Sequence, residues 1–379
     1  MLDFEYLKEN KYDYLIVGIG LSGAVLAERL ASINKKVLII DKRNHIGGNC
    51  YDYIDENQIL MNKYGAHLFH TNDKDVWDYI NKFCKWKRWD HKVLAKVDDD
   101  LVNIPVNINT VNKIFDKNIL DSMEMDAFLK SIQIQYDRIE NSEEIAKSRV
   151  GEVLFEKLFK DYTYKQWAKY PIELDKSVLE RIPVRNNHDE RYFSDKYQAL
   201  PEFGYTHFIN QLISNKNIEI LLNTDFFNLK DKINYSQLIY TGPIDRYFES
   251  IGLEKLEYRS INFEIEQIKN INYYQTNSVI NFPGSNIEYT RIVEYKHFLN
   301  QTSPHTTIVK ETTTDIGDPY YPVPNKKNLD LYQKYIKLSE NEKNTHFIGR
   351  LANYKYFNMD QAIKNSLDYF NNTLLNINF

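Results

Sequence analysis

The chain has 379 residues, of which 42% are hydrophobic and 27% charged, and its formal net charge is −5. This composition is typical of a globular protein of two or three domains, and it excludes wholesale disorder, collagen and a simple coiled coil. The acidic balance argues against nucleic-acid binding, and no apolar run reaches the ~18 residues of a membrane span. Two cysteines, Cys50 and Cys84, make neither a disulfide framework nor a zinc site. We therefore expect a cytoplasmic protein without membrane insertion.

The first structured unit is expected after a loose extension over residues 1–10. A short β-rich run covers residues 11–17, apolar residues at nearly helical spacing cover 24–33, and a second apolar run covers 37–40 and ends at Asp41. A strand, a tight turn, a helix and a strand in this order predict one βαβ unit with a parallel sheet.

The turn of this unit carries the glycine pattern of a dinucleotide-binding site. Gly18 permits the tight turn, Gly20 lets the backbone approach a pyrophosphate at a helix N-terminus, and Gly23 allows close helix–strand packing. Asp41, 18 residues beyond Gly23, is placed to accept a hydrogen bond from a ribose hydroxyl. The glycine pattern alone is a weak signal, but its position between a strand and a helix makes it specific.

The pattern leaves open whether the cofactor is NAD or FAD. A second glycine pair, Gly47 and Gly48, follows the second strand, as it does where the chain passes close to an extended FAD. A late strand–glycine–helix element over residues 347–359 also fits FAD, because a helix N-terminus stabilises an anionic reduced flavin. These features favour FAD.

The remainder of the chain predicts an α/β fold in which an FAD-binding Rossmann-like domain carries an inserted helical domain and an antiparallel β-sheet domain. The FAD-binding domain is expected over residues 1–90, with returns at about 205–250 and 340–379. The pattern is mostly helical over 105–200, and short β-like runs broken by Gly, Pro and Asn indicate an antiparallel sheet over 255–325.

Ten segments, in order along almost the whole chain, resemble the bacterial UDP-galactopyranose mutases, a family of flavin-dependent nucleotide-sugar mutases. They are residues 13–18 (DYLIVG), 42–49 (KRNHIGGN), 63–72 (KYGAHLFHTN), 162–167 (YTYKQW), 181–185 (RIPVR), 192–195 (YFSD), 240–245 (YTGPID), 289–291 (YTR), 319–322 (PYYP) and 349–352 (GRLA). Several of these segments are long and specific, so chance similarity is a poor explanation.

The resemblance implies an isomerase that interconverts UDP-galactopyranose and UDP-galactofuranose with no net redox change. In this family N5 of reduced FAD attacks the anomeric carbon and expels UDP, and a flavin–sugar iminium lets the ring open and reclose. The protein then supplies position and electrostatics to a cofactor nucleophile. The resemblance also implies a homodimer and a role in the synthesis of furanose-containing cell-surface polysaccharides.

The resemblance assigns the catalytic roles to two arginines and two histidines. Arg181, on a mobile loop near residues 170–190, and Arg291 match the family's diphosphate ligands, and a guanidinium offers paired donors to phosphate. His67 and His70 lie in the segment that the family places along the reactive side of the flavin. No metal-ligand cluster and no Ser-His-Asp candidate is evident.

Two larger sets of residues are assigned by the same resemblance. The expected substrate-binding residues are Phe159 and Tyr162, which stack on the uracil, together with Trp167, Tyr192, Asn281, Tyr321, Tyr356 and His91. The expected cofactor-binding residues are Gly18, Gly20, Ser22, Gly23, Asp41, Lys42, Gly48, Asn49, His67, Leu68, Gly349, Arg350, Asn358 and Met359.

Three alternatives remain at this point. Related enzymes use the same chemistry on UDP-N-acetylgalactosamine or dTDP-fucose, so the sugar and the base are open. The glycine pattern by itself also fits an FAD-dependent oxidoreductase. A non-catalytic nucleotide-sugar-binding protein is the third alternative.

Overall fold

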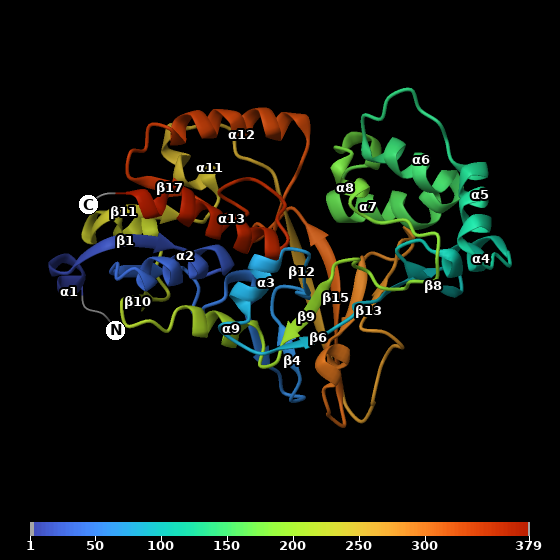
Figure 1. The fold of residues 1–379 in the computed structure, drawn as a ribbon, viewed down its shortest axis with the longest axis horizontal. Helices are drawn as coiled ribbons and strands as arrows, with labels where there is room; N and C mark the ends of the chain where they lie inside the picture. Colours follow the sequence, from blue (N-terminus) through green and yellow to red (C-terminus); the bar gives the residue numbers. More distant parts are fainter. Residues whose placement is uncertain (1–3, 378–379) are drawn as a thin grey trace.

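A five-stranded parallel sheet forms one side of the molecule in the computed structural model, which describes residues 4–377 (Figure 1). Its strands stand in the order β10-β2-β1-β11-β17, and all neighbouring pairs are parallel. The bounds are β1 (Lys11–Val17), β2 (Val37–Ile40), β10 (Ile218–Leu221), β11 (Asn234–Tyr240) and β17 (Thr345–Phe347). The βαβ unit expected from the sequence is confirmed, and the chain leaves the sheet between β2 and β10.

Both faces of this sheet are covered, which explains why β2 is apolar along its whole length. Val37 and Ile39 share one apolar cluster with α2 (Leu21–Ser32) and α13 (Met359–Asn372). Leu38 and Ile40 point to the other face, where they pack in a second cluster with Phe226 of the short helix α10 (Phe226–Leu229). A parallel sheet buried on both sides is the Rossmann arrangement. We call this part the Rossmann lobe.

A second lobe, the helical lobe, is built from residues 108–180 and lies apart from the parallel sheet in Figure 1. Its helices are α4 (Ile108–Phe115), α5 (Ser122–Ile132), α6 (Ser142–Phe155), α7 (Asp161–Trp167) and α8 (Ser177–Glu180). Asn107, Asp121 and Asn141 cap the first three by accepting backbone N–H bonds, so each start is encoded locally. The helical pattern was expected to reach residue 200, but residues 181–196 lack helix and Tyr197–Pro201 form β9.

The third part, the sheet lobe, is a seven-stranded sheet in the order β16-β12-β15-β14-β13-β7-β8. The bounds are β7 (Val93–Val97), β8 (Asp100–Ile104), β12 (Tyr258–Ile268), β13 (Val279–Asn281), β14 (Arg291–Glu294), β15 (Thr306–Thr314) and β16 (Tyr321–Pro322). Its strands between residues 258 and 322 are antiparallel to one another, as expected. The expectation of a purely antiparallel sheet is corrected, because β7 joins β13 in parallel and brings β8 with it.

The remaining elements connect these three lobes. They are α1 (Phe4–Glu9), α3 (Lys74–Ile80), α9 (Tyr205–Leu212), α11 (Ile244–Tyr247), α12 (Lys326–Ser339), the pair β3 (Asp52–Ile54) and β4 (Leu60–Asn62), and the three-stranded sheet of β5 (Phe69–Thr71), β9 and β6 (Trp86–Arg88). The loose extension expected over residues 1–10 is wrong for the part that is described, since α1 is helical there. Within residues 4–377, no helix is long and apolar enough to cross a membrane.

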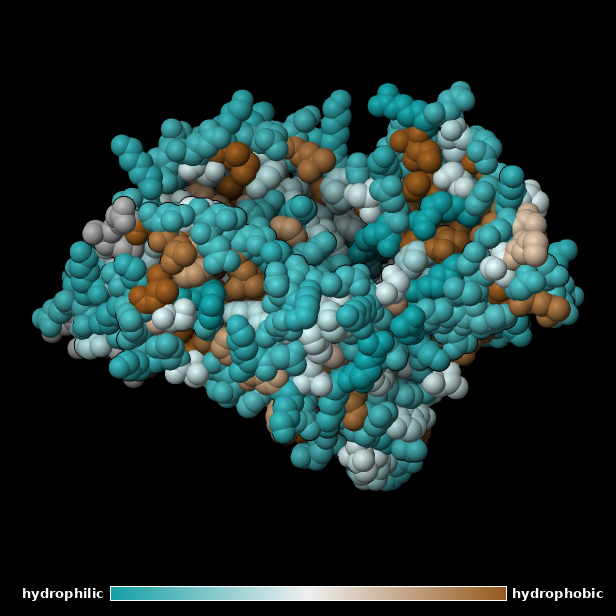
Figure 2. All heavy atoms as spheres, viewed as in Figure 1, coloured by the Kyte–Doolittle hydropathy of each residue, from teal (hydrophilic) through white to brown (hydrophobic). Residues whose placement is uncertain are grey.

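The surface is hollowed between the helical lobe and the rest of the molecule (Figure 2). The hollow lies where the carboxyl ends of the parallel strands, the sheet lobe and the helical lobe meet. Side chains from all three parts line the cavity at this place. The fold therefore positions one site at the junction of three lobes.

Candidate active site

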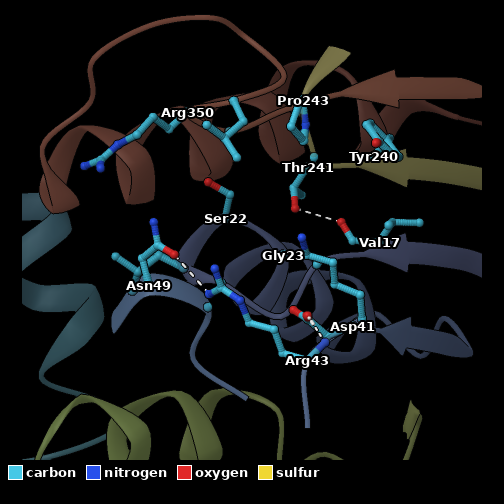
Figure 3. Close-up of a pocket in the computed structure, with 18 of the residues that line it drawn as sticks. Val17, Ser22, Gly23, Asp41, Arg43, Asn49, Tyr240, Thr241, Pro243 and Arg350 are labelled. Atoms are coloured by element: carbon cyan, nitrogen blue, oxygen red, sulfur yellow. Dashed lines mark hydrogen bonds between the residues drawn. The ribbon is translucent and has the colours of Figure 1, made fainter. Parts of the chain in front are cut away.

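A groove of about 310 Å³ runs across the carboxyl ends of β1 and β11, where the strand order of the parallel sheet reverses. This is the place at which open α/β sheets bind dinucleotides. The glycine turn after β1 lines the groove, and Thr241, directly after β11, donates a hydrogen bond of 2.7 Å to the Val17 carbonyl oxygen (Figure 3). The N-terminal ends of α2 and α13 both line it, so two positive helix ends face any anion bound there.

Asp41 lies toward one end of this groove (Figure 3). Its two carboxylate oxygens accept hydrogen bonds of 2.9 Å from the backbone N–H groups of Ile19 and Arg43. These bonds fix the carboxylate, and each oxygen retains a lone pair for a further donor. The residue thus fits the role of accepting from a ribose hydroxyl.

The loop after β2 closes the groove from a second side. At Gly48, with φ +54°, a Cβ would lie 2.8 Å from Gly20 Cα, so the two glycine turns touch and form one wall. Arg43 donates a 3.0 Å hydrogen bond to the Asn49 side chain and reaches Asp318 of the sheet lobe at 3.0 Å. This continuous backbone wall fits a long dinucleotide such as FAD.

A second cavity, of about 240 Å³, adjoins the groove under the helical lobe. The two share His67, Arg350 and Met359, which therefore stand between them. Three guanidinium groups, those of Arg181, Arg291 and Arg350, line the second cavity, and the described residues that line it include no Asp or Glu. In a chain of net charge −5, this is a locally built site for an anion.

Arg291 stands in a row of side chains across the sheet lobe. Asn281 of β13 pairs with Arg291 of β14, which pairs with Glu311 of β15. The Arg291 Nε donates to Glu311 Oε2 at 2.6 Å, and Glu311 is 2% exposed. A buried carboxylate behind the guanidinium fixes its direction and leaves its outer N–H groups toward the cavity. The buried Asn281 Oδ1, which also belongs to this cavity, has no hydrogen-bond partner among residues 4–377.

Arg181 enters from the opposite side, at the end of α8. Its guanidinium carbon lies 4.6 Å from the centre of the Tyr356 ring, and that of Arg350 lies 5.4 Å from the same ring. Tyr356 stacks on Tyr321 with ring centres 5.4 Å apart. Burial favours the neutral phenol, but the Arg181 and Arg350 guanidinium groups outweigh it and lower the pKa of Tyr356. This side of the cavity is therefore strongly electropositive.

An aromatic wall closes the end of the cavity beneath the helical lobe. Phe159 lies in a π-helical turn, Glu156–Lys160, and Tyr162 follows in α7, so both face the cavity. Single π-helical turns inside helices are frequent at functional sites because they rotate a side chain out of the regular helical pattern. Trp167, 5% exposed, packs near Tyr321 at the same end. The wall offers a flat apolar surface to a nucleobase.

Three histidines lie on the side of the cavity nearest the groove. His67 Nδ1 donates to the Gly65 carbonyl oxygen at 2.7 Å, and burial lowers the pKa of His67 to about 4, so its Nε2 is a free acceptor at neutral pH. His70 stacks on Phe193 and donates to Asp195 at 3.0 Å. His91 is 3% exposed, and burial lowers its pKa to about 3.

The structure brings all of the expected substrate-binding and catalytic residues to the second cavity. Tyr192 also reaches it, and its backbone N–H donates to the His91 carbonyl oxygen. Of the expected cofactor-binding residues, Ser22, Lys42, Asn49 and Gly349 line the groove, but Leu68 and Asn358 line only the second cavity. Asn358 is also the N-cap of α13.

Sequence reasoning missed three residues that support the site. They are Glu311, Asp318 and Lys165. Lys165 lies within residues 162–167, one of the segments that resemble the family, but it was given no role. Glu311 and Asp318 stand in no pattern of their own, and the pairing of Glu311 with Arg291 is visible only once the strand register is known.

We compared the chain with known protein families, curated proteins and solved structures. A family model described as UDP-galactopyranose mutase matches residues 157–356, and a model of NAD(P)-binding Rossmann-like domains matches residues 16–83. The chain is 36% identical over 363 residues to a Klebsiella pneumoniae protein described as "Probable UDP-galactopyranose mutase", with 94% of each chain covered. It is 36% identical to the dTDP-fucopyranose mutase of Escherichia coli, over 93% of this chain and 96% of the relative.

A third relative, the UDP-galactopyranose mutase of Mycoplasma genitalium, is 34% identical over 93% of both chains. Among solved structures, a reduced UDP-galactopyranose mutase is similar with a TM-score of 0.76, 16% identity, and coverage of 96% of this chain and 94% of that one. At this identity the structural likeness shows the fold alone.

The fold is that of an FAD-binding Rossmann protein, and the match to the family model and the curated relatives places the chain in the nucleotide-sugar mutase class of isomerases. More particularly, the chain belongs to the UDP-galactopyranose mutase family.

Proposed function

We propose that this protein interconverts UDP-galactopyranose and UDP-galactofuranose with reduced FAD bound in the groove. The observation that carries the proposal is the second cavity, where three guanidinium groups and an aromatic wall meet the groove at His67, Arg350 and Met359. A nucleoside diphosphate needs both features, because its base stacks and its phosphates are anionic. The arrangement leaves the sugar between the diphosphate ligands and the groove.

Reduced FAD, when bound, supplies the nucleophile N5 for the anomeric carbon. Arg181 and Arg291 would bind the diphosphate, stabilise the charge that develops on it as the glycosidic bond breaks, and retain it for the return step. Tyr356 and Tyr321 present hydroxyl groups to the same anion. His67 Nε2 and His91, neutral at physiological pH, can hydrogen-bond sugar hydroxyls without adding charge.

The identity of the sugar and the base is the finer part of the proposal. A dTDP-fucopyranose mutase and a UDP-galactopyranose mutase relative have the same identity to this chain, 36%, so dTDP-fucose is the second candidate. The family model, which carries the UDP-galactopyranose mutase description over residues 157–356, favours the UDP sugar.

The decisive experiment is a reduced-flavin assay against a panel of nucleotide sugars. Dithionite-reduced protein is incubated with UDP-galactofuranose, UDP-N-acetylgalactosamine and both ring forms of dTDP-fucose, and products are separated by chromatography. We expect the highest kcat/KM with UDP-galactofuranose. Conversion of none of these sugars contradicts the proposal, and stoichiometric peroxide or reduced acceptor indicates an FAD-dependent oxidoreductase instead.

Assembly and location are proposed on the family resemblance alone. We infer a homodimer in the cytoplasm that supplies furanose sugars for surface polysaccharides. Light scattering of the purified holoenzyme measures the mass in solution, and a mass of one chain refutes the dimer.

A further inference from the structure

The loop between β13 and β14, residues 282–290, has no regular secondary structure, although a site residue flanks it at each end. Asn281 ends β13 directly before the loop, and Arg291 begins β14 directly after it. The pairing of Asn281 with Arg291 and the hydrogen bond from the Phe282 backbone N–H to the Thr290 carbonyl oxygen fix the two ends of the loop. They do not fix the course of residues 283–289, nor where this hairpin lies relative to the helical lobe, so a separate contact is needed for both.

That contact comes from Lys165 of α7 in the helical lobe. Its ammonium group donates to four backbone carbonyl oxygens of the loop, those of Phe282, Gly284 at 2.8 Å, Ile287 at 2.9 Å and Tyr289 at 3.2 Å. An ammonium group has three N–H donors, so the four carbonyl oxygens occupy all of them and at least two oxygens share one N–H. One side chain thus contacts the backbone of the loop from its first residues to its last.

Two further hydrogen bonds join the same two lobes, and in these the donors belong to the sheet lobe. The Lys165 carbonyl oxygen accepts a hydrogen bond from the Thr313 hydroxyl of β15, and the Gln166 carbonyl oxygen accepts one of 3.3 Å from Arg259 of β12. The end of α7 and the sheet lobe are therefore interlocked by donors from both sides. Burial lowers the pKa of Lys165 to about 8, which leaves it largely protonated at pH 7.

The position of Lys165 in α7 relates this junction to the nucleobase wall. Tyr162 lies three residues earlier on the same helix, and residues at this spacing lie on one face. The helix that carries Tyr162 toward the cavity is thus the helix that holds the loop beside Arg291. The bonds of the Lys165 ammonium group therefore help to set the distance between the base-stacking wall and this diphosphate ligand, together with those from Thr313 and Arg259.

We propose that Lys165 is a positioning residue that holds the Arg291 hairpin at a fixed distance from Tyr162, so that one nucleoside diphosphate contacts both. The inference rests on the proposed function, because it assigns base and diphosphate to these two places. Lys165 does not touch the substrate. Its effect on nucleotide binding passes through Arg291.

The test is a double-mutant cycle on the FAD-loaded, oxidised holoenzyme, with the dissociation constants of UDP and dTDP measured by calorimetry. Lys165→Met is expected to weaken binding of the preferred nucleotide about tenfold while FAD content is retained. In an Arg291→Ala background the same change should add less than about twofold, whereas in an Arg181→Ala background it should keep its tenfold effect. Lys160→Met, which breaks an exposed pair with Glu156 in the adjoining helical turn, is the matched control and should change binding less than twofold.

Two kinds of result overturn the inference. One is binding by Lys165→Met within twofold of the wild type. The other is an equal effect in all three backgrounds, or loss of FAD, since both indicate a general structural role. A second variant distinguishes loss of the ammonium group from poor folding. Lys165→Cys is made in a Cys84→Ser background and alkylated with 2-bromoethylamine, which restores an amine at the same distance. The alkylated protein should recover wild-type binding of the nucleotide. Failure to recover it counts against the lysine ammonium.

The outcome is separable from that of the proposed function. Binding is measured without turnover, so a wild type that binds UDP but isomerises no sugar refutes the function and leaves the cycle interpretable. A wild type that binds neither nucleotide refutes the proposed function before any variant is compared.

Discussion

At the scale of single residues, the arginines of the second cavity are held in place by buried or aromatic partners. Arg291 is held by the 2% exposed Glu311, and Arg181 and Arg350 flank Tyr356. Cations fixed in this way do not need to reorganise when negative charge develops on a leaving diphosphate. Burial lowers the pKa of His67 and of His91 beside them, so these two histidines stay neutral and do not add to the positive charge.

Arg291→Ala tests the first half of this account. The change removes the proposed diphosphate ligand and leaves the buried Glu311 carboxylate without its partner, so we expect kcat/KM to fall by about 100-fold or more. FAD should stay bound, because Arg291 lines the second cavity and not the groove. Steady-state kinetics together with flavin absorbance measure both, and retention of most activity contradicts the role.

His91→Gln tests the second half through stability. The folded pKa of His91 is about 3, below the ordinary value near 6.5 in the unfolded chain, so between these values only the unfolded state binds the proton. The histidine therefore lowers the free energy of unfolding as pH falls through this window, by about 1.4 kcal/mol per pH unit. Urea unfolding at several pH values between 6.5 and 4 should show a shallower loss in the variant. An unchanged slope would refute the neutral, buried histidine.

At the scale of elements, short local irregularities set where the functional side chains point. The π-helical turn Glu156–Lys160 rotates Phe159 toward the cavity, and Arg181 is the C-cap residue directly after α8. The helix α6 is kinked at Gly151, which has φ +74°. These features decide the direction of the aromatic wall and of the arginine opposite Arg291.

Arg181→Ala is expected to act mainly on nucleotide binding. Arg181 lies in the segment near residues 170–190, which we propose moves over the bound substrate, and its guanidinium would hold the closed loop on the bound anion. KM should therefore rise at least about tenfold, with a smaller fall in kcat. Kinetics of the variant that match the wild type would remove this residue from the proposed loop.

Gly151→Ala is expected to destabilise the helical lobe. A Cβ at Gly151 would lie 2.4 Å from the Ile132 carbonyl oxygen, in addition to the cost of a positive φ. Gly252 is the matched control, because its φ is +76° and nothing lies within 4 Å of its Cβ position. We expect a loss of about 2–4 kcal/mol for Gly151→Ala and about 1 kcal/mol for Gly252→Ala in urea unfolding. Equal losses would show that the contact with Ile132 is unimportant.

At the scale of the whole molecule, the three lobes share one apolar core, and polar contacts add to it where they meet around the site. Lys165 joins the helical lobe to the sheet lobe, and Asp318 of the sheet lobe pairs with Lys42 at 2.9 Å and Arg43 at 3.0 Å beside the groove. The cofactor groove is therefore closed partly by a segment that lies far from it in the chain. Cofactor retention and substrate binding depend on the same assembly of lobes.

Asp318→Asn is expected to speed the release of FAD. The pairs with Lys42 and Arg43 are partly exposed, so the effect should be modest, about threefold in the rate. Release is followed by dilution of the holoenzyme into an excess of an FAD-capturing apoprotein. Glu254→Gln, which removes a surface pair with Lys327, should leave the rate unchanged. A wild-type rate in Asp318→Asn would show that these pairs do not close the groove.

Much of the Rossmann lobe was predictable because its signals are local. Hydrophobic periodicity, the glycine turn and the acid that follows β2 specify β1, α2 and β2 within a few residues, and the predicted strands agree with the observed bounds. The helical pattern up to residue 180 was likewise visible in the sequence, although its expected end at residue 200 was wrong. The candidate site residues were likewise identified from short motifs that resemble those of the family.

The sequence alone determined the cofactor-binding fold, the family and the residues that lie together at the site, because short contiguous motifs carry the signal for each of them. Only the tertiary structure decided that β7 and β8 complete the sheet lobe, that Glu311 stands behind Arg291, and that Lys165 gathers the loop 282–290. Lys165 and this loop are separated by more than 100 residues along the chain. Such pairings arise from the path of the backbone through three lobes, and no local pattern of side chains encodes them.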